Sequence, residues 1–248
     1  MGLLLAAGLG AGAVNAAAGG GSLITFPALM ATGLPPKIAN VTNSVAVCPG
    51  YVASVAGSWR DVGEEWRTLL RLLPTIIVGT ATGCALLLVT SADAFARVVP
   101  FLVLAAAAVL AFQERIKAVV GHPHQMGTRK RAIAMHTLVG IGCVYGGYFG
   151  AALGVMLVAV LGLLVNASLR RITAMKNVVS AVEGAVTVAY FAVFADVQWS
   201  AVALLAPATI AGGYAGARIA RRIPQRVLRA GIIAYAVIVA VVLFFRAF

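Results

Sequence analysis

Polar side chains occur within long apolar stretches of this chain. Asn43, Asn177, Lys176 and Glu183 lie in segments that are otherwise rich in Ala, Val, Leu and Ile. An amide donates two hydrogen bonds to an oxyanion, and an ammonium group supplies positive charge. A carboxyl group inside a membrane segment indicates function by default, and one that can be protonated suits proton coupling. These residue types point to recognition of a small anion together with movement of a proton.

Each of these residues also has a structural interpretation. Asparagines hydrogen-bond neighbouring helices in membrane proteins, and a lysine near a helix end can extend to the membrane surface. Glu183 follows Lys176 by seven residues, which places both on one face of a helix. The carboxyl group can therefore be a proton-coupling group or the partner of a Lys, Arg or Tyr. The residues alone leave these alternatives open.

A glycine-rich break interrupts the first apolar region, which reads "NAAAGGGSLITFP" from Asn15 to Pro27. Glycine costs roughly 1 kcal/mol relative to alanine in a helix interior. The apolar segment 22–33 corresponds to only about 18 Å of helix, too short to cross a bilayer. We therefore expect two broken helices that meet at the glycines. Their free N–H groups would face protein or a cavity and could bind an anion, and Ser22 is expected to cap the second helix.

A second glycine-rich stretch, "GIGCVYGGYFGAALG" from Gly140 to Gly154, stands at the equivalent place of the second half. We expect a second break there, facing the first. The alternative is that the glycines only permit close packing of helices, as in small-xxx-small motifs.

The composition places the chain in a membrane. Hydrophobic residues make up 62% and charged residues 10%, against about 45–50% and 25% in soluble domains. The net charge of +12 is attributed to basic loops on one membrane side, because no basic run alternates with aromatic residues as nucleic-acid binding would require. No catalytic, metal-binding or nucleotide-binding motif is present, so we predict no enzyme activity, metal or cofactor.

Ten apolar segments form two sets of five. The pattern W-x7-P-x4-G-x3-G begins at Trp66 and again at Trp199, so it recurs at an offset of 133 residues. Asn43 and Asn177, like Gly20 and Gly154, are 134 residues apart. We predict an all-α integral membrane protein with two repeats. They comprise residues 1–112 and 132–248, joined by a linker over 113–131.

The distribution of basic residues predicts the orientation. With the linker in the cytoplasm, only Lys37, Arg97 and Arg246 of the 19 Lys and Arg fall outside. Cytoplasmic loops are normally the basic ones, so both termini are predicted to be periplasmic. An odd number of segments in each repeat then gives the halves opposite orientations. Such inverted-topology repeats, with sites at broken helices, are typical of secondary transporters.

The quoted motifs now suggest a family. "NAAAGGGSLITFPALMATGLPPKIANVTNSVA" resembles the first-repeat signature of the sulfite exporter TauE/SafE family, also called the toluene sulfonate uptake permease family. "YGGYFGAALGVMLVAVLGL" with "ITAMKNVVS", and "WSAVALLAPATIAGGYAGARIARRIP", resemble its later segments. The resemblance implies a bacterial inner-membrane transporter of sulfite, organosulfonates or related anions. The second break departs from the family pattern, which often has more glycine where this chain has Gly150-Ala151-Ala152-Leu153-Gly154.

The sequence thus predicts a secondary transporter of small sulfur-containing anions with membrane lipid around it and no nucleic-acid partner. An anion channel or uniporter on the same scaffold, and a non-transporting receptor, are the alternatives. The candidate substrate-binding residues are Gly19, Gly20, Gly21, Ser22, Thr42, Asn43, Tyr148, Gly150, Lys176 and Asn177, and the candidate proton-coupling residue is Glu183. The anion, the direction of transport, the coupling ion and homo-oligomerisation stay open.

Overall fold

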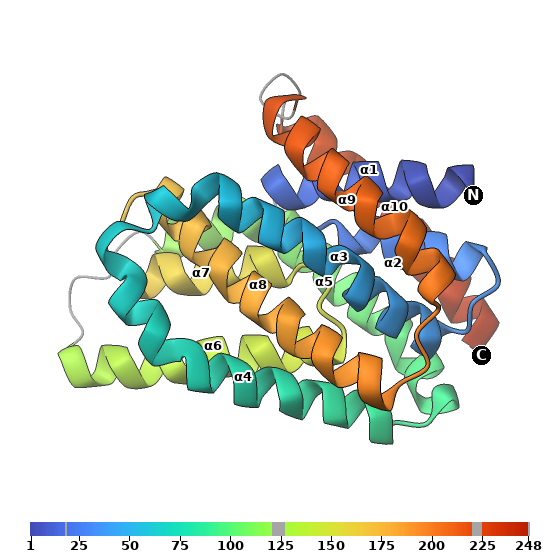
Figure 1. Cartoon of the computed structure of the whole chain (residues 1–248), viewed down its shortest axis with the longest axis horizontal. Coiled ribbons are helices and arrows are strands. Elements are labelled where there is room, and N and C mark those ends of the chain that lie inside the picture. The colour runs from blue at the N-terminus through green and yellow to red at the C-terminus, as the bar shows by residue number, and fades with distance from the viewer. Residues whose placement is uncertain (18, 121–126, 220–224, 248) are drawn as a thin grey trace.

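The computed structural model describes residues 1–17, 19–120, 127–219 and 225–247, and within them the chain forms ten α-helices and no strand (Figure 1). The helices of the first half are α1 Gly2–Ala17, α2 Ser22–Ala31, α3 Pro36–Ser58, α4 Trp66–Val89 and α5 Ala92–Val120. Those of the second half are α6 Thr128–Tyr148, α7 Leu153–Leu164, α8 Leu169–Phe194, α9 Trp199–Ile219 and α10 Gln225–Ala247. The all-α prediction is therefore confirmed.

The helices follow the predicted apolar segments closely except around the linker. Helix α5 continues to Val120 and α6 already begins at Thr128, so most of 113–131 is helical. The extension has a local cause, since Gln, Glu, Arg, Lys and Ala, which follow the apolar run, are all good helix formers. Residues 121–126 of the linker lie outside the described part.

The two halves are interleaved. Helix α1 packs along α9, and α4 packs along α6, while α3 and α8 lie against each other in the middle (Figure 1). A Cβ on Gly79 of α4 would lie 2.9 Å from the carbonyl oxygen of Gly140 in α6. A Cβ on Gly212 of α9, the counterpart of Gly79 at the offset of 133, would overlap the carbonyl group of Leu9 in α1. This exchange of partners is the pairing that the predicted repeat requires.

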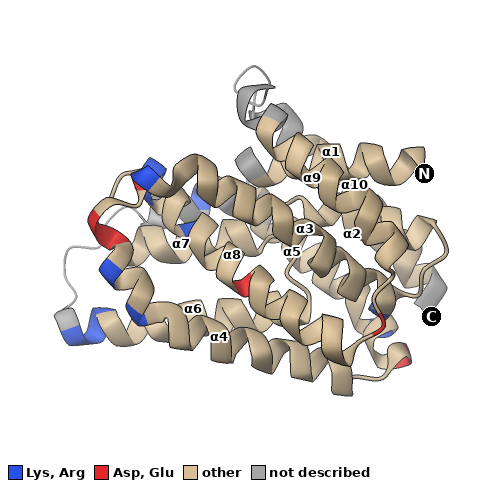
Figure 2. Cartoon of the chain, in the orientation of Figure 1, with Lys and Arg blue, Asp and Glu red and all other residues tan. Residues whose placement is uncertain are grey.

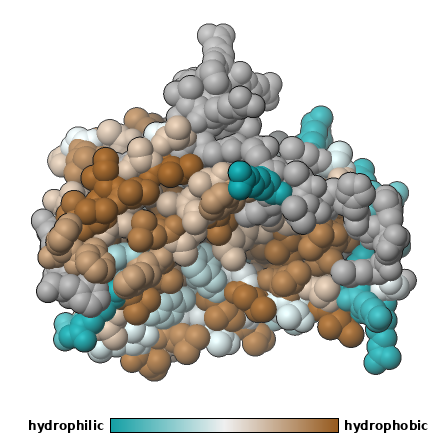
Figure 3. Space-filling view, turned by 180° about the vertical axis from the view of Figure 1, so that it is seen from behind, coloured by the Kyte–Doolittle hydropathy of each residue, from teal (hydrophilic) through white to brown (hydrophobic). Residues whose placement is uncertain are grey.

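The described surface is suited to lipid. Three helical stretches of the described residues are long and apolar enough to cross a bilayer: Gly63–Val89, Ala92–Val109 and Arg170–Phe194. Hydrophobic residues dominate the described part of the face in Figure 3, with the most hydrophilic side chains mainly toward its two ends. Side chains such as Val78 and Val193 are exposed on the outside of the bundle. The chain is a multi-pass membrane protein.

Charge gathers at one end of the bundle. Most described Lys and Arg lie where α3 passes into α4 and where α6 begins (Figure 2). Arg170 at the start of α8 forms an ion pair of 2.8 Å with Asp61 in this region. The start of α1 and the end of α10 lie at the opposite end (Figure 1). The side chains from Arg218 to Arg229, which the sequence assigns to the cytoplasmic side, lie outside the described part.

Candidate functional site

The first break separates α1 from α2. Gly19 adopts a φ of +82°, which favours glycine, and its N–H group donates to the carbonyl oxygen of Val14 over 3.1 Å. The N–H group of Gly21 donates to Asn15 Oδ1 over 2.8 Å. The expectation that Ser22 caps α2 is wrong, because the cap position is Gly21 and no side-chain cap bond is formed there. The buried Asn15, on the preceding helix, satisfies the free N–H group instead.

The second break separates α6 from α7. Gly150 has a φ of +72°, and Ala152 has a φ of +60°, a conformation that costs an alanine roughly 1–2 kcal/mol. The carbonyl oxygen of Tyr145 accepts the N–H groups of both Phe149 and Gly150, and the Tyr145 hydroxyl donates to the carbonyl oxygen of Ala151 over 2.7 Å. The carbonyl oxygen four residues before Gly150 therefore loses its usual helical donor.

The two breaks touch each other. A Cβ on Gly19 would lie 2.9 Å from the Cα atom of Gly154, at the start of α7. Gly154 is the repeat counterpart of Gly20, so the contact joins equivalent parts of the two halves. Only glycine at both positions lets the backbones come this close.

Lys176 lies at this junction. Its side chain from α8 passes Gly154, where an added Cβ would be 3.2 Å from Lys176 Cδ. The residue is only 4% exposed. Among the described residues, the Lys176 ammonium group has no ion pair and no hydrogen-bond partner. An unpaired buried cation is costly, so the junction of the breaks has a positive charge in need of an anion.

A small cavity lies beside the same breaks. It measures about 270 Å³, slightly below the usual range of ligand pockets. Four segments line it: the start of α2 with Ser22, α3 with Ser44, Val47 and Tyr51, the end of α6 with Gly146, Phe149 and Gly150, and α8 with Glu183, Gly184 and Thr187. Glu183 is buried, and its Oε1 accepts a hydrogen bond of 3.3 Å from the Thr187 hydroxyl.

The position of Glu183 follows from the crossing of α3 and α8. The two helices run antiparallel, because Cys48 packs against Gly184 while Asn177, near the start of α8, donates to Ser58 at the end of α3. Under the predicted repeat, each helix meets its own counterpart close to Gly184. Glu183 is therefore near the middle of the bundle. Lys176 lies about 10 Å along α8 toward the basic end, from seven residues at 1.5 Å each.

The structure does not bring Asn43 and Asn177 together. Asn43 accepts a hydrogen bond from the Thr25 hydroxyl of α2. Asn177 donates over 3.0 Å to Ser58, which is about 22 Å along α3 from Asn43. Antiparallel packing of equivalent helices causes this, since it sends equivalent residues toward opposite membrane surfaces.

Other candidates also have partners within the protein. The Thr42 hydroxyl oxygen accepts the N–H group of Gln198 over 3.1 Å. The carbonyl oxygen of Tyr148 accepts from Asn40 over 2.9 Å, and the Tyr148 hydroxyl donates to Thr90 over 3.5 Å. These bonds join the two halves near the end that bears the termini. Of the candidates, the structure gathers Gly19, Ser22, Gly150, Lys176 and Glu183 around the two breaks.

Sequence reasoning missed three lining residues of the cavity, Tyr51, Gly146 and Thr187. One signal was available for Thr187, which follows Glu183 by one helical turn and so shares its face. A second signal concerned Gly184, whose counterpart at the offset of 134 is Gly50. No comparable pattern marks Tyr51.

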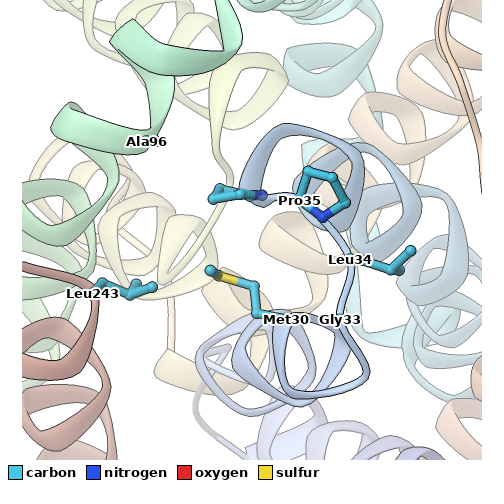
Figure 4. Close-up of a pocket in the computed structure, with 7 residues that line it drawn as sticks. Met30, Gly33, Leu34, Pro35, Ala96 and Leu243 are labelled. Atoms are coloured by element: carbon cyan, nitrogen blue, oxygen red, sulfur yellow. The ribbon is translucent and has the colours of Figure 1, made fainter. Parts of the chain in front are cut away.

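A larger crevice is apolar. The connection between α2 and α3 meets α5 and α10 there, and Met30, Leu34, Pro35, Ala96 and Leu243 line it (Figure 4). Among all the described residues, no group of three or more His, Cys, Asp or Glu gathers anywhere as a metal site would require. The charged cavity and junction, rather than the crevice, form the candidate site.

Helices broken in pairs, buried ionisable groups at the breaks and a lipid-facing exterior define a membrane transporter. The family model described as "Sulfite exporter TauE/SafE" matches residues 4–243, and the chain belongs to this family. A "Probable membrane transporter protein" of Haemophilus influenzae is 24% identical over 217 residues, which cover 88% of this chain and 84% of the relative. The "Probable membrane transporter protein YfcA" of Escherichia coli K12 is 26% identical over 236 residues, covering 92% and 84%. No solved structure matches the chain.

Proposed function

We propose that this chain is a secondary transporter that moves small sulfur-containing anions, such as sulfite or organosulfonates, across the bacterial inner membrane. The family description names sulfite export, and the relatives are named as probable membrane transporters. Transport in this proposal involves binding and conformational change without a catalytic step or a cofactor.

Lys176 is the observation on which the proposal rests. It is a buried cation without a partner among the described residues, beside the point where both breaks meet. A sulfite or sulfonate group would supply the missing negative charge, and its oxygens would accept hydrogen bonds from the ammonium group. Backbone N–H groups of Gly19, Gly20, Gly21 and Gly150 would add donors when the breaks separate.

The polar candidates on α3 and α8 then serve different stages of transport. Asn43 and Thr42 lie toward the end with the termini, and Asn177 lies toward the basic end. The anion would pass Asn43 on one side of the junction and Asn177 on the other. Ser22 and Tyr148, which flank the breaks, complete the proposed path.

Glu183 is the proposed proton-coupling group. It is the only Asp or Glu in α8 (Figure 2), and it lies near the middle of the bundle without an ion pair among the described residues. A carboxyl group there can pick up a proton from one side and release it to the other. Its distance of about 10 Å along α8 from Lys176 keeps a negative charge away from the anion.

Flux measurements in liposomes test the function. We expect purified protein to take up radiolabelled sulfite saturably, and faster when a proton gradient is imposed. Glu183→Gln should retain anion binding but lose the response to the gradient. Saturable flux indifferent to the gradient in the unmodified protein would support a uniporter, and non-saturating flux a channel. No flux of sulfite or of any sulfonate would contradict the proposal and favour a receptor.

Binding measurements test the role of Lys176. Lys176→Met should weaken sulfite binding between about tenfold and a hundredfold, because a hydrogen bond to a charged group contributes roughly 1.5–3 kcal/mol. Lys130→Met provides a matched control, since Lys130 is exposed at the start of α6. Equal affinities of the two variants would place the anion elsewhere.

The repeat and its orientation form part of the proposal. Residues 1–112 and 132–248 would be inverted repeats, with the 113–131 linker cytoplasmic and both termini periplasmic. The exchanged packing of α1 on α9 and α4 on α6, and the basic end opposite the termini, support this. The three native cysteines are buried, so a Gly127→Cys variant gives a clean probe. We expect an impermeant thiol reagent to label it only after cells are opened; labelling of intact cells would reverse the orientation.

A further inference from the structure

The chemical character of the Glu183 cavity differs from that of the Lys176 junction. Among the described residues, no Lys, Arg or His forms an ion pair with Glu183. The nearby titratable groups on the packed helices are Cys48 and Tyr51 of α3, Cys84 of α4 and Cys143 of α6. Thiols and phenols supply no positive charge, so nothing around the cavity compensates an ionised carboxylate.

Several oxygens at the cavity have already given away their hydrogens. The Thr187 hydroxyl donates to Glu183 Oε1, and the Ser44 hydroxyl donates to the carbonyl oxygen of Asn40 over 3.0 Å. A hydroxyl that donates its hydrogen still has oxygen lone pairs that can face another group. Ser44 and Thr187 can therefore act as neutral oxygen ligands.

The broken helix adds a backbone oxygen. Because Gly150 bonds to Tyr145, the carbonyl oxygen of Gly146 receives no hydrogen bond from any described residue. It lies beside Gly150, where an added Cβ would be 3.0 Å away, and both glycines line the cavity. The carboxyl end of a helix carries partial negative charge, which also favours a cation.

We propose that the Glu183 cavity is a sodium site, formed by the Glu183 carboxylate, the Ser44 and Thr187 hydroxyl oxygens and the Gly146 carbonyl oxygen. Sodium and protons would compete for the same carboxylate. Carboxylate, hydroxyl and carbonyl oxygens suit a hard cation, and carbonyl groups freed by broken helices bind coupling ions in other transporters. A single carboxylate balances one positive charge, whereas a divalent ion would leave net charge at the centre of the membrane. This inference deepens the proposed function by naming a coupling ion.

A binding experiment tests the site without any anion. The thermal midpoint of the purified full chain is measured in increasing NaCl, with choline chloride keeping the ionic strength constant. We expect a saturable rise with sodium, because a ligand that binds only the folded state stabilises it. Glu183→Gln should abolish the rise, and Glu64→Gln, on an exposed turn, should retain it. No difference between sodium and choline, or an undiminished rise in Glu183→Gln, overturns the site.

Proton competition in the unmodified protein covers the case in which Glu183→Gln does not fold. Ligand carboxylates must lose their proton to bind a metal, so acidification should weaken sodium binding by up to about tenfold per pH unit. Sodium affinity that does not fall on acidification overturns the competition. Sodium binding without anion flux would leave the site standing and remove the proposed function. Proton-driven sulfite flux without any sodium effect would do the reverse.

Discussion

The helices α3 and α8 occupy equivalent places in the two halves, yet their buried polar residues differ in kind. On α3 the buried Thr42 and Asn43 are neutral and both hydrogen-bond within the protein. On α8 the residue equivalent to Thr42 is Lys176, which has no partner among the described residues. Glu183 stands where α3 has Pro49. A repeated scaffold thus places its ionisable groups in one half only, so the architecture and the chemistry can be tested separately.

The largest expected effect concerns the packing that the halves share. Gly79→Ala and Gly212→Ala should each destabilise the protein by about 1–3 kcal/mol or more, since the added Cβ meets backbone atoms that cannot move aside. Thermal unfolding in detergent measures this. Gly57→Ala is the control, because nothing lies within 4 Å of its Cβ position. If only one of the two variants lost stability, the equivalence of the halves would be broken.

The next effect separates Lys176 from its counterpart. Lys176→Met should leave stability unchanged or raise it, because it removes an unpaired buried charge, while sulfite transport falls between about tenfold and a hundredfold. Thr42→Val should lower stability by about 0.5–1.5 kcal/mol through the lost hydrogen bond from Gln198 and leave transport nearly intact. Unfolding curves and flux of both variants decide this. Matching losses of stability and flux in the two would make Lys176 structural.

A smaller effect compares the bonds that support the two breaks. Asn15→Ala leaves the Gly21 N–H group without its acceptor and should cost about 0.5–2 kcal/mol, as loss of a helix cap does. Tyr145→Phe removes the bond to the Ala151 carbonyl and should cost about 0.5–1.5 kcal/mol. Denaturant unfolding of both variants measures the difference. An Asn15→Ala variant as stable as the parent would show that Gly21 finds another acceptor.

The smallest effect lies at the basic end. Arg170 is largely exposed, and its ion pair with Asp61 should contribute no more than about 1 kcal/mol and weaken further in salt. A double-mutant cycle with Arg170→Ala and Asp61→Ala at low and high ionic strength measures the coupling. A coupling well above that value, and insensitive to salt, would assign the α3–α4 connection a larger role in joining the halves.

The sequence by itself determined the helices and the breaks. Apolar runs predicted the bounds of α4 and α8 closely, because lipid imposes a length and a composition on a helix. Three consecutive glycines predicted the first break for the same reason that they disfavour a helix. The matching offsets of Trp, Pro and Gly anticipated which helices would exchange partners.

Only the tertiary structure decided which residues meet. Asn43 and Asn177 are equivalent in sequence, but antiparallel packing sends them to opposite ends. Tyr51 and Gly146 line the Glu183 cavity although no motif joins them. Asn15 rather than Ser22 satisfies the first break. Contacts between distant segments depend on crossing points and on which face each helix turns inward, and in a chain this uniformly apolar the periodicity of side chains carries little information about either.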